Sequence, residues 1–202
     1  MTKHLFLDAN IYLSFYLFGK DDLEEMMKVV KLVRDEEITL HTNSHLSKEI
    51  ARNREVKIAE GFTAIKATNF AREYPHYFGD YAELQNLRAK LKEVSQLHSA
   101  LIERARSDIE KKTLKADRLI AGLLKLGTSN EISPASVERA ILRSELGDPP
   151  GKKGSIGDAI HWQSLLSSDA LSIDIVSLDA DFASALDSNK ISAFLHEEWK
   201  SK

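Results

Sequence analysis

The chain has 202 residues, which is the size of one ordinary domain and leaves no room for a large multidomain protein. Apolar residues make up 43% of the chain and charged residues 29%, and because these shares are close to those of an average soluble globular protein, a wholly disordered chain is excluded. The formal net charge of −3 argues against binding of nucleic acid by bulk positive charge alone, but not against a nucleic-acid enzyme whose carboxylates are gathered in a metal site.

Three features that the sequence lacks exclude further classes of protein and site. There is no cysteine, which excludes disulfides, thiolate-bound zinc, iron–sulfur clusters and a cysteine nucleophile. The N-terminal stretch has Asp8 inside its apolar run and no small-residue cleavage site after it, so no signal peptide is predicted. The apolar runs are only a few residues long, far short of the roughly 20 that a membrane helix needs. We therefore expect a soluble, cytoplasmic protein with no membrane association.

The N-terminal part of the chain alternates between short strands and helices. Residues 4–7 form an apolar run that stops at Asp8, as expected for a buried strand that ends in a turn. Residues 38–42 are rich in β-forming side chains and are predicted as a second strand. Three helices are expected here: one that begins within 11–18, one that Asp21 or Asp22 caps and that reaches Val33, and one that Asn43 or Ser44 caps.

The middle of the chain, from about Arg54 to Leu126, is predicted to be almost entirely helical, with an interruption at 74–80. Residues 84–118 contain nine Lys or Arg against five Asp or Glu. This positive excess indicates either a solvated helix face or a surface that meets nucleic-acid phosphates. The same stretch carries an apolar stripe near heptad spacing, which predicts packing against another helix. The stripe consists of Leu84, Leu87, Leu91, Val94, Leu97 and Leu101.

The C-terminal part returns to alternating helices and strands. Ser133 is predicted to cap a helix that begins with proline and ends before Gly147. The elements expected after it are a loop over 147–154, an amphipathic helix over 156–166, a strand over 173–178 and a short helix from Asp181. The alternation as a whole predicts an α/β fold with a mostly parallel sheet.

Five carboxylates follow a predicted strand or lie near the start of a predicted helix. Active sites of parallel α/β sheets lie beyond the carboxyl ends of the strands, so these side chains are expected to converge. Clustered carboxylates raise one another's pKa, and a divalent cation relieves the repulsion. Oxygen ligands without histidine or cysteine favour Mg²⁺ or Mn²⁺, and two such ions can activate water and stabilise the leaving oxygen in phosphodiester hydrolysis. The five are Asp8, Glu49, Asp158, Asp179 and Asp181.

Two other pairs of residues have side chains of the kinds that bind a metal ion or a phosphate. His41 and His45 are four residues apart, but they lie on either side of an expected strand–helix junction and are not predicted to hold a metal ion together. Lys152 and Lys153 lie in the loop that leads to Asp158, where they are either two solvated lysines or a clamp for a substrate phosphate. The loop does not match the phosphate-binding motif of ATP-binding proteins.

Three short motifs resemble those of PIN domain nucleases, in the same order along the chain. Leu5–Asn10 (LFLDAN) resembles their first motif, a strand that ends in Asp-x-Asn. Gly157–Ile160 (GDAI) resembles their third, an aspartate at the start of a helix, and the loop before it (DPPGKKG) is similar to that of a mainly bacterial subgroup. Val176–Phe182 (VSLDADF) resembles their last motif. The resemblance extends over essentially the whole chain.

The resemblance implies a three-layer α/β/α fold with a central, mostly parallel sheet. It implies one domain over residues 1–202 that carries a long helical insertion at about 54–146, since this stretch exceeds the compact PIN core.

The resemblance also implies roles for individual residues. Asn10 and Ser177 are expected to order the first and last motifs by hydrogen bonding, and Ala9 stands where many members have a hydroxyl side chain. Glu49 is the expected catalytic glutamate of the second motif, with Glu55 as the alternative. The implied metal ligands are Asp8, Asp158 and Asp179, which are catalytic with Glu49, and the adjacent Asp181.

The function that the resemblance implies is that of a metal-dependent endoribonuclease, possible roles being a toxin or a defence effector. Its partners would then be RNA, an antitoxin or other protein, and a second copy of the chain. The alternative is a catalytically silent PIN-like module that binds RNA or a protein, but the three intact aspartates argue against it. A phosphatase of the haloacid-dehalogenase type also begins with a strand ending in aspartate, yet it needs a second aspartate where this chain has Asn10.

Overall fold

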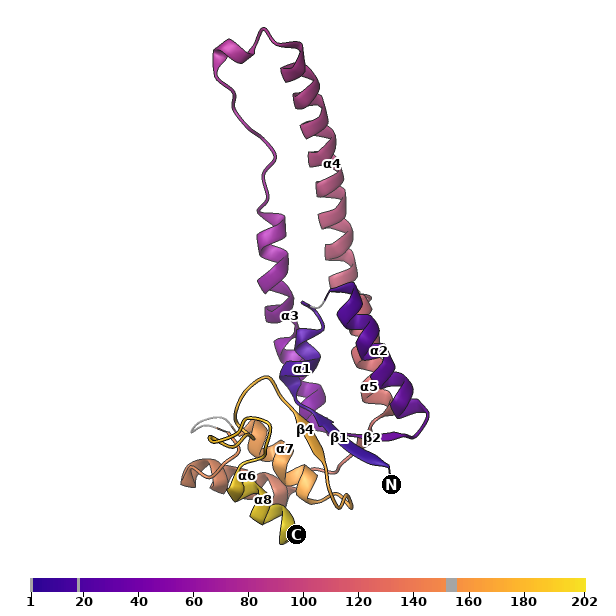
Figure 1. Cartoon of the computed structure of the whole chain (residues 1–202), viewed down its shortest axis with the longest axis vertical. Helices are drawn as coiled ribbons and strands as arrows, with labels where there is room; N and C mark the ends of the chain where they lie inside the picture. Colours follow the sequence, from indigo (N-terminus) through magenta and orange to yellow (C-terminus); the bar gives the residue numbers. More distant parts are fainter. Residues whose placement is uncertain (1, 18, 152–155) are drawn as a thin grey trace. The chain divides into compact units, whose positions relative to one another are not determined.

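The computed structural model describes residues 2–17, 19–151 and 156–202, and its helices and strands are labelled in Figure 1 where there is room. The chain forms two compact units: the first consists of residues 1–57 and 119–202, and the second of residues 58–118. Helices α3 (Ser44–Lys66) and α5 (Lys115–Leu126) each belong in part to both units. That residues 54–146 are an insertion in a single domain stays a prediction.

The first unit is built on a four-stranded sheet in which all neighbouring strands are parallel, as the sequence predicted. The order is β3-β2-β1-β4. Leu7, the last residue of β1, pairs with Val176, the last residue of β4, so the residues that follow these two strands lie at the same edge of the sheet. The strands are β1 (Lys3–Leu7), β2 (Ile38–Thr42), β3 (Thr128–Ser129) and β4 (Asp174–Val176).

The outer strands differ from the prediction. Strand β3 was not predicted, because two polar residues are too few for any periodic signal. It pairs with the end of β2, where His41 lies beside Thr128. Strand β4 is shorter than the expected 173–178, and its Val176 is exposed. The edge strands are therefore the least regular part of the sheet.

Along the chain, helices precede and follow the strands of the first unit. The polypeptide enters α1 at once after β1, because the Asp8 carboxylate accepts a hydrogen bond from the Ala9 backbone N–H at the helix start. The predicted start within 11–18 was therefore too late. In α2, neither Asp21 nor Asp22 is the capping residue: Gly19 is, and the Asp22 carboxylate accepts from its backbone N–H. The helices are α1 (Ala9–Ser14), α2 (Lys20–Arg34), α6 (Pro134–Leu146), α7 (Gly157–Leu166) and α8 (Ala193–Lys200).

Helix α7 is enclosed by the core of the first unit. All seven residues from Ala159 to Leu165 are buried, so the prediction of an amphipathic helix was wrong. Its residues Ala159 and Ile160 pack with Ala140 of α6, and its Trp162 packs with Phe182 and with Leu195 of α8. The side chains of His161, Gln163 and Ser164 are consequently buried, where a polar group without a hydrogen-bond partner destabilises the fold.

The short helix expected from Asp181 is absent from the described residues 177–192. Ala183 instead pairs with Ile191 in an isolated antiparallel bridge, and the Ser184 backbone N–H donates to the carbonyl of Lys190 at 2.7 Å. The segment folds back on itself and brings Phe182 into the core beside Trp162. So short a segment carries no periodic pattern that could distinguish a helix from a segment that folds back on itself.

The second unit is mainly helical, as predicted. It contains the C-terminal part of α3, the short 3-10 helix η1 (His76–Phe78), α4 (Ala82–Glu110) and the first residues of α5. The interruption between the helices is longer than expected, because α3 ends at Lys66. Within the unit, the His98 ring contacts the carbonyl of Ile65 at 3.1 Å and the ring of Phe70.

The apolar stripe of α4 is only partly covered. Leu84 is buried and Leu91 is half-buried, but the other four positions are exposed, Leu97 to 72%. The prediction that the stripe packs against another helix of the chain is therefore wrong for Leu87, Val94, Leu97 and Leu101. Among the described residues, no helix is both long enough and apolar enough to span a membrane.

Candidate functional site

A cavity of about 340 Å³ in the first unit brings the five predicted carboxylates together. Its walls come from the residues that follow β1 and β4, from the N-terminal turn of α7 and from α3. The lining residues are Asp8, Ala9, Asn10, Leu13, Glu49, Asn53, Asp158, Asp179 and Asp181. The alternative glutamate, Glu55, is exposed and is not among them. Lys152 and Lys153 lie outside the described residues.

Asp8 is the most deeply placed of these carboxylates, with an exposed fraction of 4%. One oxygen accepts the Ala9 backbone N–H at 2.6 Å, and the other accepts the Ser177 hydroxyl at 2.7 Å. Burial raises the pKa of Asp8, and the nearby Asp179 charge raises it too, although the Ser177 hydrogen bond acts in the opposite direction. A cation bound nearby would stabilise the ionised form of such a buried carboxylate.

Asn10 joins the ends of β1 and β4. Its side-chain NH₂ lies 2.9 Å from Asp8 Oδ2 and 2.8 Å from Asp179 Oδ2, and its carbonyl oxygen accepts the Leu178 backbone N–H at 3.1 Å. The Ser177 hydroxyl oxygen lies within 3.1 Å of Asp179 Oδ1 and 3.0 Å of Asn10 Nδ2. Because two neutral side chains contact both carboxylates, the separation of Asp8 and Asp179 is set by hydrogen bonds across the sheet edge.

Asp158 lies in the first turn of α7 and carries the largest carboxylate perturbation of the site. Burial raises its pKa to about 6, and the charges of Asp8, Asp181 and Asp179 contribute in the same direction. Three other carboxylates thus act on Asp158 electrostatically. Asp181 itself donates its backbone N–H to Asp179 Oδ1 at 3.3 Å.

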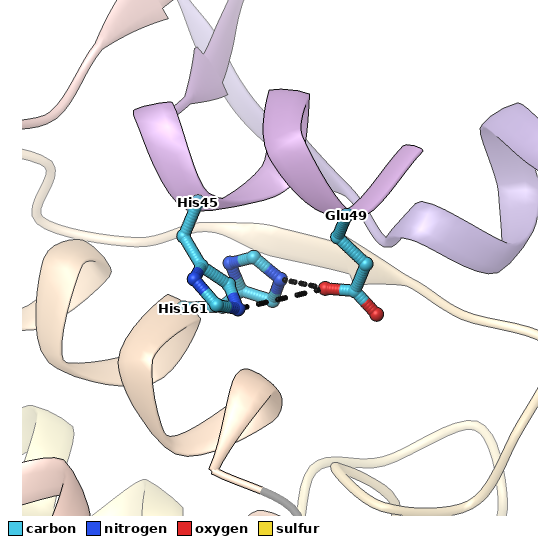
Figure 2. Close-up of side chains that lie close together, drawn as sticks. All are labelled: His45, Glu49 and His161. Carbon is cyan, nitrogen blue, oxygen red and sulfur yellow. Dashed lines mark hydrogen bonds and ion pairs between the residues drawn. The ribbon is translucent and has the colours of Figure 1, made fainter. Parts of the chain in front are cut away.

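Glu49, on the second turn of α3, differs from the aspartates because a histidine contacts it. His161 Nε2 lies 3.0 Å from Glu49 Oε2, and this hydrogen bond is the main reason that the pKa of Glu49 is lowered. His45 Nε2 lies 3.9 Å from the same oxygen, and burial lowers the pKa of His45. Figure 2 shows the two imidazoles converging on one carboxylate oxygen.

These three side chains are a possible metal-binding group that sequence reasoning missed. In the described part of the chain, they are the one set of three His, Asp or Glu residues whose ligand atoms all lie within 4.8 Å of one another. The signal was in the sequence: His45 and Glu49 are four residues apart, and Asp158 and His161 are three apart, so each pair shares one face of its helix. His41, which is four residues before His45, does not belong to this group and instead contacts His4 and Asn130.

The donor set of the cavity fits hard divalent cations. Four aspartates and a glutamate offer oxygen ligands, and burial raises the pKa of Asp8 and of Asp158, with the charges of neighbouring aspartates adding to the effect. Such a site can hold a cation against the oxygens of a phosphate ester, because both carry negative charge that the cation neutralises.

Comparison with known proteins agrees with the motifs. A family model described as PIN domain matches residues 5–182, which is most of the chain and includes every carboxylate of the cavity. No curated protein and no solved structure matches the chain.

Proposed function

The chain belongs to the PIN domain family, a family of nucleases that use divalent metal ions, and from this premise we propose that it is an endoribonuclease that depends on Mg²⁺ or Mn²⁺. The observation that carries the proposal is the convergence of five carboxylates on one cavity, with the pKa of Asp158 raised to about 6 by burial and by its acidic neighbours. A cluster of this charge is costly without cations, and cation-assisted phosphodiester hydrolysis is the chemistry that uses it.

In this proposal Asp8, Asp158 and Asp179 hold the cations, with Asp181 beside them and Glu49 as the second acidic position. The cations supply activation of water and stabilisation of the leaving oxygen. Asn10 and Ser177 hold the carboxylates of Asp8 and Asp179 at their separation through the hydrogen bonds described above. The site therefore needs no side-chain nucleophile.

The finer parts of the proposal concern the substrate and partners. RNA rather than DNA is proposed as the substrate, with Lys152 and Lys153 in contact with its phosphates. A role as a toxin or defence effector, controlled by an antitoxin or other protein, and a homodimeric state are extensions of the same proposal. The competing function, a silent module that only binds RNA or a protein, is disfavoured by Asp8, Asp158 and Asp179, which all line the cavity.

The test is cleavage of a labelled single-stranded RNA, with a DNA of the same sequence alongside, in Mg²⁺, in Mn²⁺ and in EDTA. We expect cleavage that EDTA stops and that Asp158→Asn slows by at least about 100-fold, which corresponds to about 2.7 kcal/mol of lost transition-state stabilisation. Asp174→Asn is the matched control, because Asp174 is an exposed aspartate of β4 outside the cavity.

Two outcomes would contradict the proposal. A wild-type protein that binds RNA but cuts neither nucleic acid in any metal would be the silent module. An Asp158→Asn variant that cuts as fast as the wild type would show that the reaction does not use this cavity.

A further inference from the structure

The buried side chains behind Glu49 form a chain of hydrogen bonds whose direction can be worked out. Asn43 immediately precedes α3, and its side-chain oxygen accepts the Leu46 backbone N–H at 2.8 Å. A backbone N–H can only donate, so this contact fixes which end of the Asn43 amide is the oxygen. The Asn43 NH₂ group therefore faces the other way, toward Ser164 Oγ at 2.8 Å and His161 Nδ1 at 3.2 Å.

The remaining contacts agree with this direction. The Ser164 hydroxyl donates to the backbone carbonyl of His161 at 2.8 Å, which leaves its oxygen free to accept from Asn43. Turning the Asn43 amide over would set its NH₂ group against the Leu46 N–H and remove the cap of α3. Asn43, His161 and Ser164 are all buried, so an unmatched donor there has no water to turn to.

The orientation of Asn43 decides the tautomer of His161. Because Nδ1 faces an NH₂ donor, it is the ring nitrogen that accepts a hydrogen bond and carries no proton, so the ring proton is on Nε2. Nε2 then donates to Glu49 Oε2, at 3.0 Å. The direction of donation thus runs from Asn43 to His161 and from His161 to Glu49.

We propose that Asn43 and His161 are positioning residues that hold the Glu49 carboxylate in the orientation needed to bind the cation of the nuclease site. The inference rests on the proposed function, since it concerns Glu49 as part of that site. Helix α7 thereby contributes twice to the cavity, with Asp158 as a ligand and His161, one turn later, as the support of a second acidic residue. His161 can do this because it is completely buried and cannot rotate away into solvent.

The competing interpretation is that His45, Glu49 and His161 bind a transition metal ion directly. A neutral histidine that binds a metal through Nε2 carries its proton on Nδ1 and normally donates it to an oxygen. In this protein that proton would point at the Asn43 NH₂ group, which is also a donor. The surroundings of His161 therefore favour a donor to Glu49 over a metal ligand.

The first experiment measures the tautomer itself and does not depend on activity. Long-range ¹H–¹⁵N correlation spectra of the metal-free protein distinguish a protonated from an unprotonated ring nitrogen. We expect His161 to carry its proton on Nε2 and none on Nδ1, and Asn43→Ser to weaken this preference, because serine can still cap α3 but has no amide to donate to Nδ1. A proton on Nδ1 of His161 in the wild-type protein would overturn the proposal.

The second experiment measures Mn²⁺ binding, by the loss of the free-ion signal in electron paramagnetic resonance, in four variants. His161→Leu removes the donor to Glu49 and should raise the Mn²⁺ dissociation constant by about 10–100-fold, the usual effect of losing such a support. His161→Gln places an amide N–H near the position of Nε2 and should bring the constant back to within about threefold of wild type. Asn43→Ser should fall between the two.

His41→Leu is the matched control, because His41 is also a buried imidazole of the first unit but contacts His4 and Asn130. It should leave Mn²⁺ binding unchanged while reporting the general effect of removing a buried histidine on thermal stability. If His161→Leu and His161→Gln weaken Mn²⁺ binding equally, donation to Glu49 is not what His161 contributes, and the proposal fails.

A titration with Co²⁺ separates the competing interpretation. A cobalt absorption spectrum that disappears in both His45→Ala and His161→Gln would show a histidine metal site and overturn the proposal. Failure of the positioning role would leave metal-dependent cleavage and its loss in Asp158→Asn intact. Failure of the nuclease proposal would instead appear as an absence of cleavage in the wild-type protein, whatever the tautomer of His161.

Discussion

The two compact units of the chain use buried residues in very different ways. The first unit buries both apolar and polar side chains, among them Asp8, Asn43 and His161, and each of these three has hydrogen-bond partners. In the second unit, which is described throughout, the buried residues are Ile58, Leu84, Ile102 and Ala116. Its helices carry exposed ion pairs between side chains one turn apart, such as Lys90–Glu93 at 3.0 Å. Each such pair stabilises the helix by only about 0.3–0.5 kcal/mol.

The difference shows where precise geometry can be maintained. A catalytic or metal-binding side chain must be held by packing and by hydrogen bonds, and only the first unit offers this around its carboxylates. The second unit instead presents exposed apolar and basic side chains, which suit contacts made over a surface. Four measurements test this difference between the two units.

The largest expected effect is on stability, from the same substitution made in each unit. Leu165→Ala removes a fully buried side chain of α7 and should lower the free energy of unfolding by about 2–5 kcal/mol. Leu101→Ala removes a side chain of α4 that is 61% exposed and should change it by about 0.5 kcal/mol or less. Urea unfolding followed by circular dichroism measures both. Equal losses would mean that the exposed stripe of α4 is covered in solution.

The second expected effect is stabilisation of the first unit by its cation. At a Mn²⁺ concentration 100 times the dissociation constant, binding to the native state alone adds about 2.7 kcal/mol. For a chain of this length that raises the melting temperature by roughly 5–10 °C. Asp158→Asn should lose most of this rise, whereas Asp174→Asn should keep it. A wild-type melting temperature that millimolar Mn²⁺ does not change would contradict the metal site.

A smaller effect is expected from pH in the metal-free protein. The pKa of Asp158 is raised from 3.8 to about 6 in the folded state, so the unfolded chain loses its proton first as the pH rises. The contribution of Asp158 to stability is therefore full below about pH 4, declines between about pH 4 and 6, and is lost above that. Asp158→Asn should become progressively more stable relative to wild type over this interval, as thermal melts in EDTA at several pH values would show. A constant difference would mean that the carboxylate is not perturbed.

The smallest expected effect concerns the basic residues of α4. Arg88, Lys92 and Arg104 are exposed, and if these side chains meet RNA phosphates, each one that neutralises a phosphate releases counterions. Changing all three to glutamine should then lower the slope of log affinity against log salt by up to about three, one for each positive charge removed. Fluorescence anisotropy with a labelled RNA across a salt series measures the slope. An unchanged slope would assign these residues to a solvated helix face.

Much of the site could be anticipated from local patterns. Asp8 and Asp179 follow apolar strands, and parallel strands end at one edge, so their proximity needed only the strand assignments. The sequence favoured Glu49 over Glu55 because Glu49 lies near the start of a predicted helix. Of these two glutamates, only Glu49 lines the cavity. His45 could have been paired with Glu49 from their spacing of four residues on α3, whereas the partners of His161, Glu49 and Asn43, lie far from it in the sequence and carry no local sign of the contact.

Short-range patterns in the sequence therefore predicted the parallel α/β class, the Ser133 cap of α6, and the aspartates that end strands or begin helices. The tertiary structure decided the rest. Helix α7 lies inside the core and not on a surface, and residues 182–191 form a paired segment and not a helix. The Nε2 atom of His161 lies within hydrogen-bond distance of Glu49. These outcomes depend on which distant groups remain to satisfy a buried donor or cover an apolar side chain, and that competition exists only once the chain has folded.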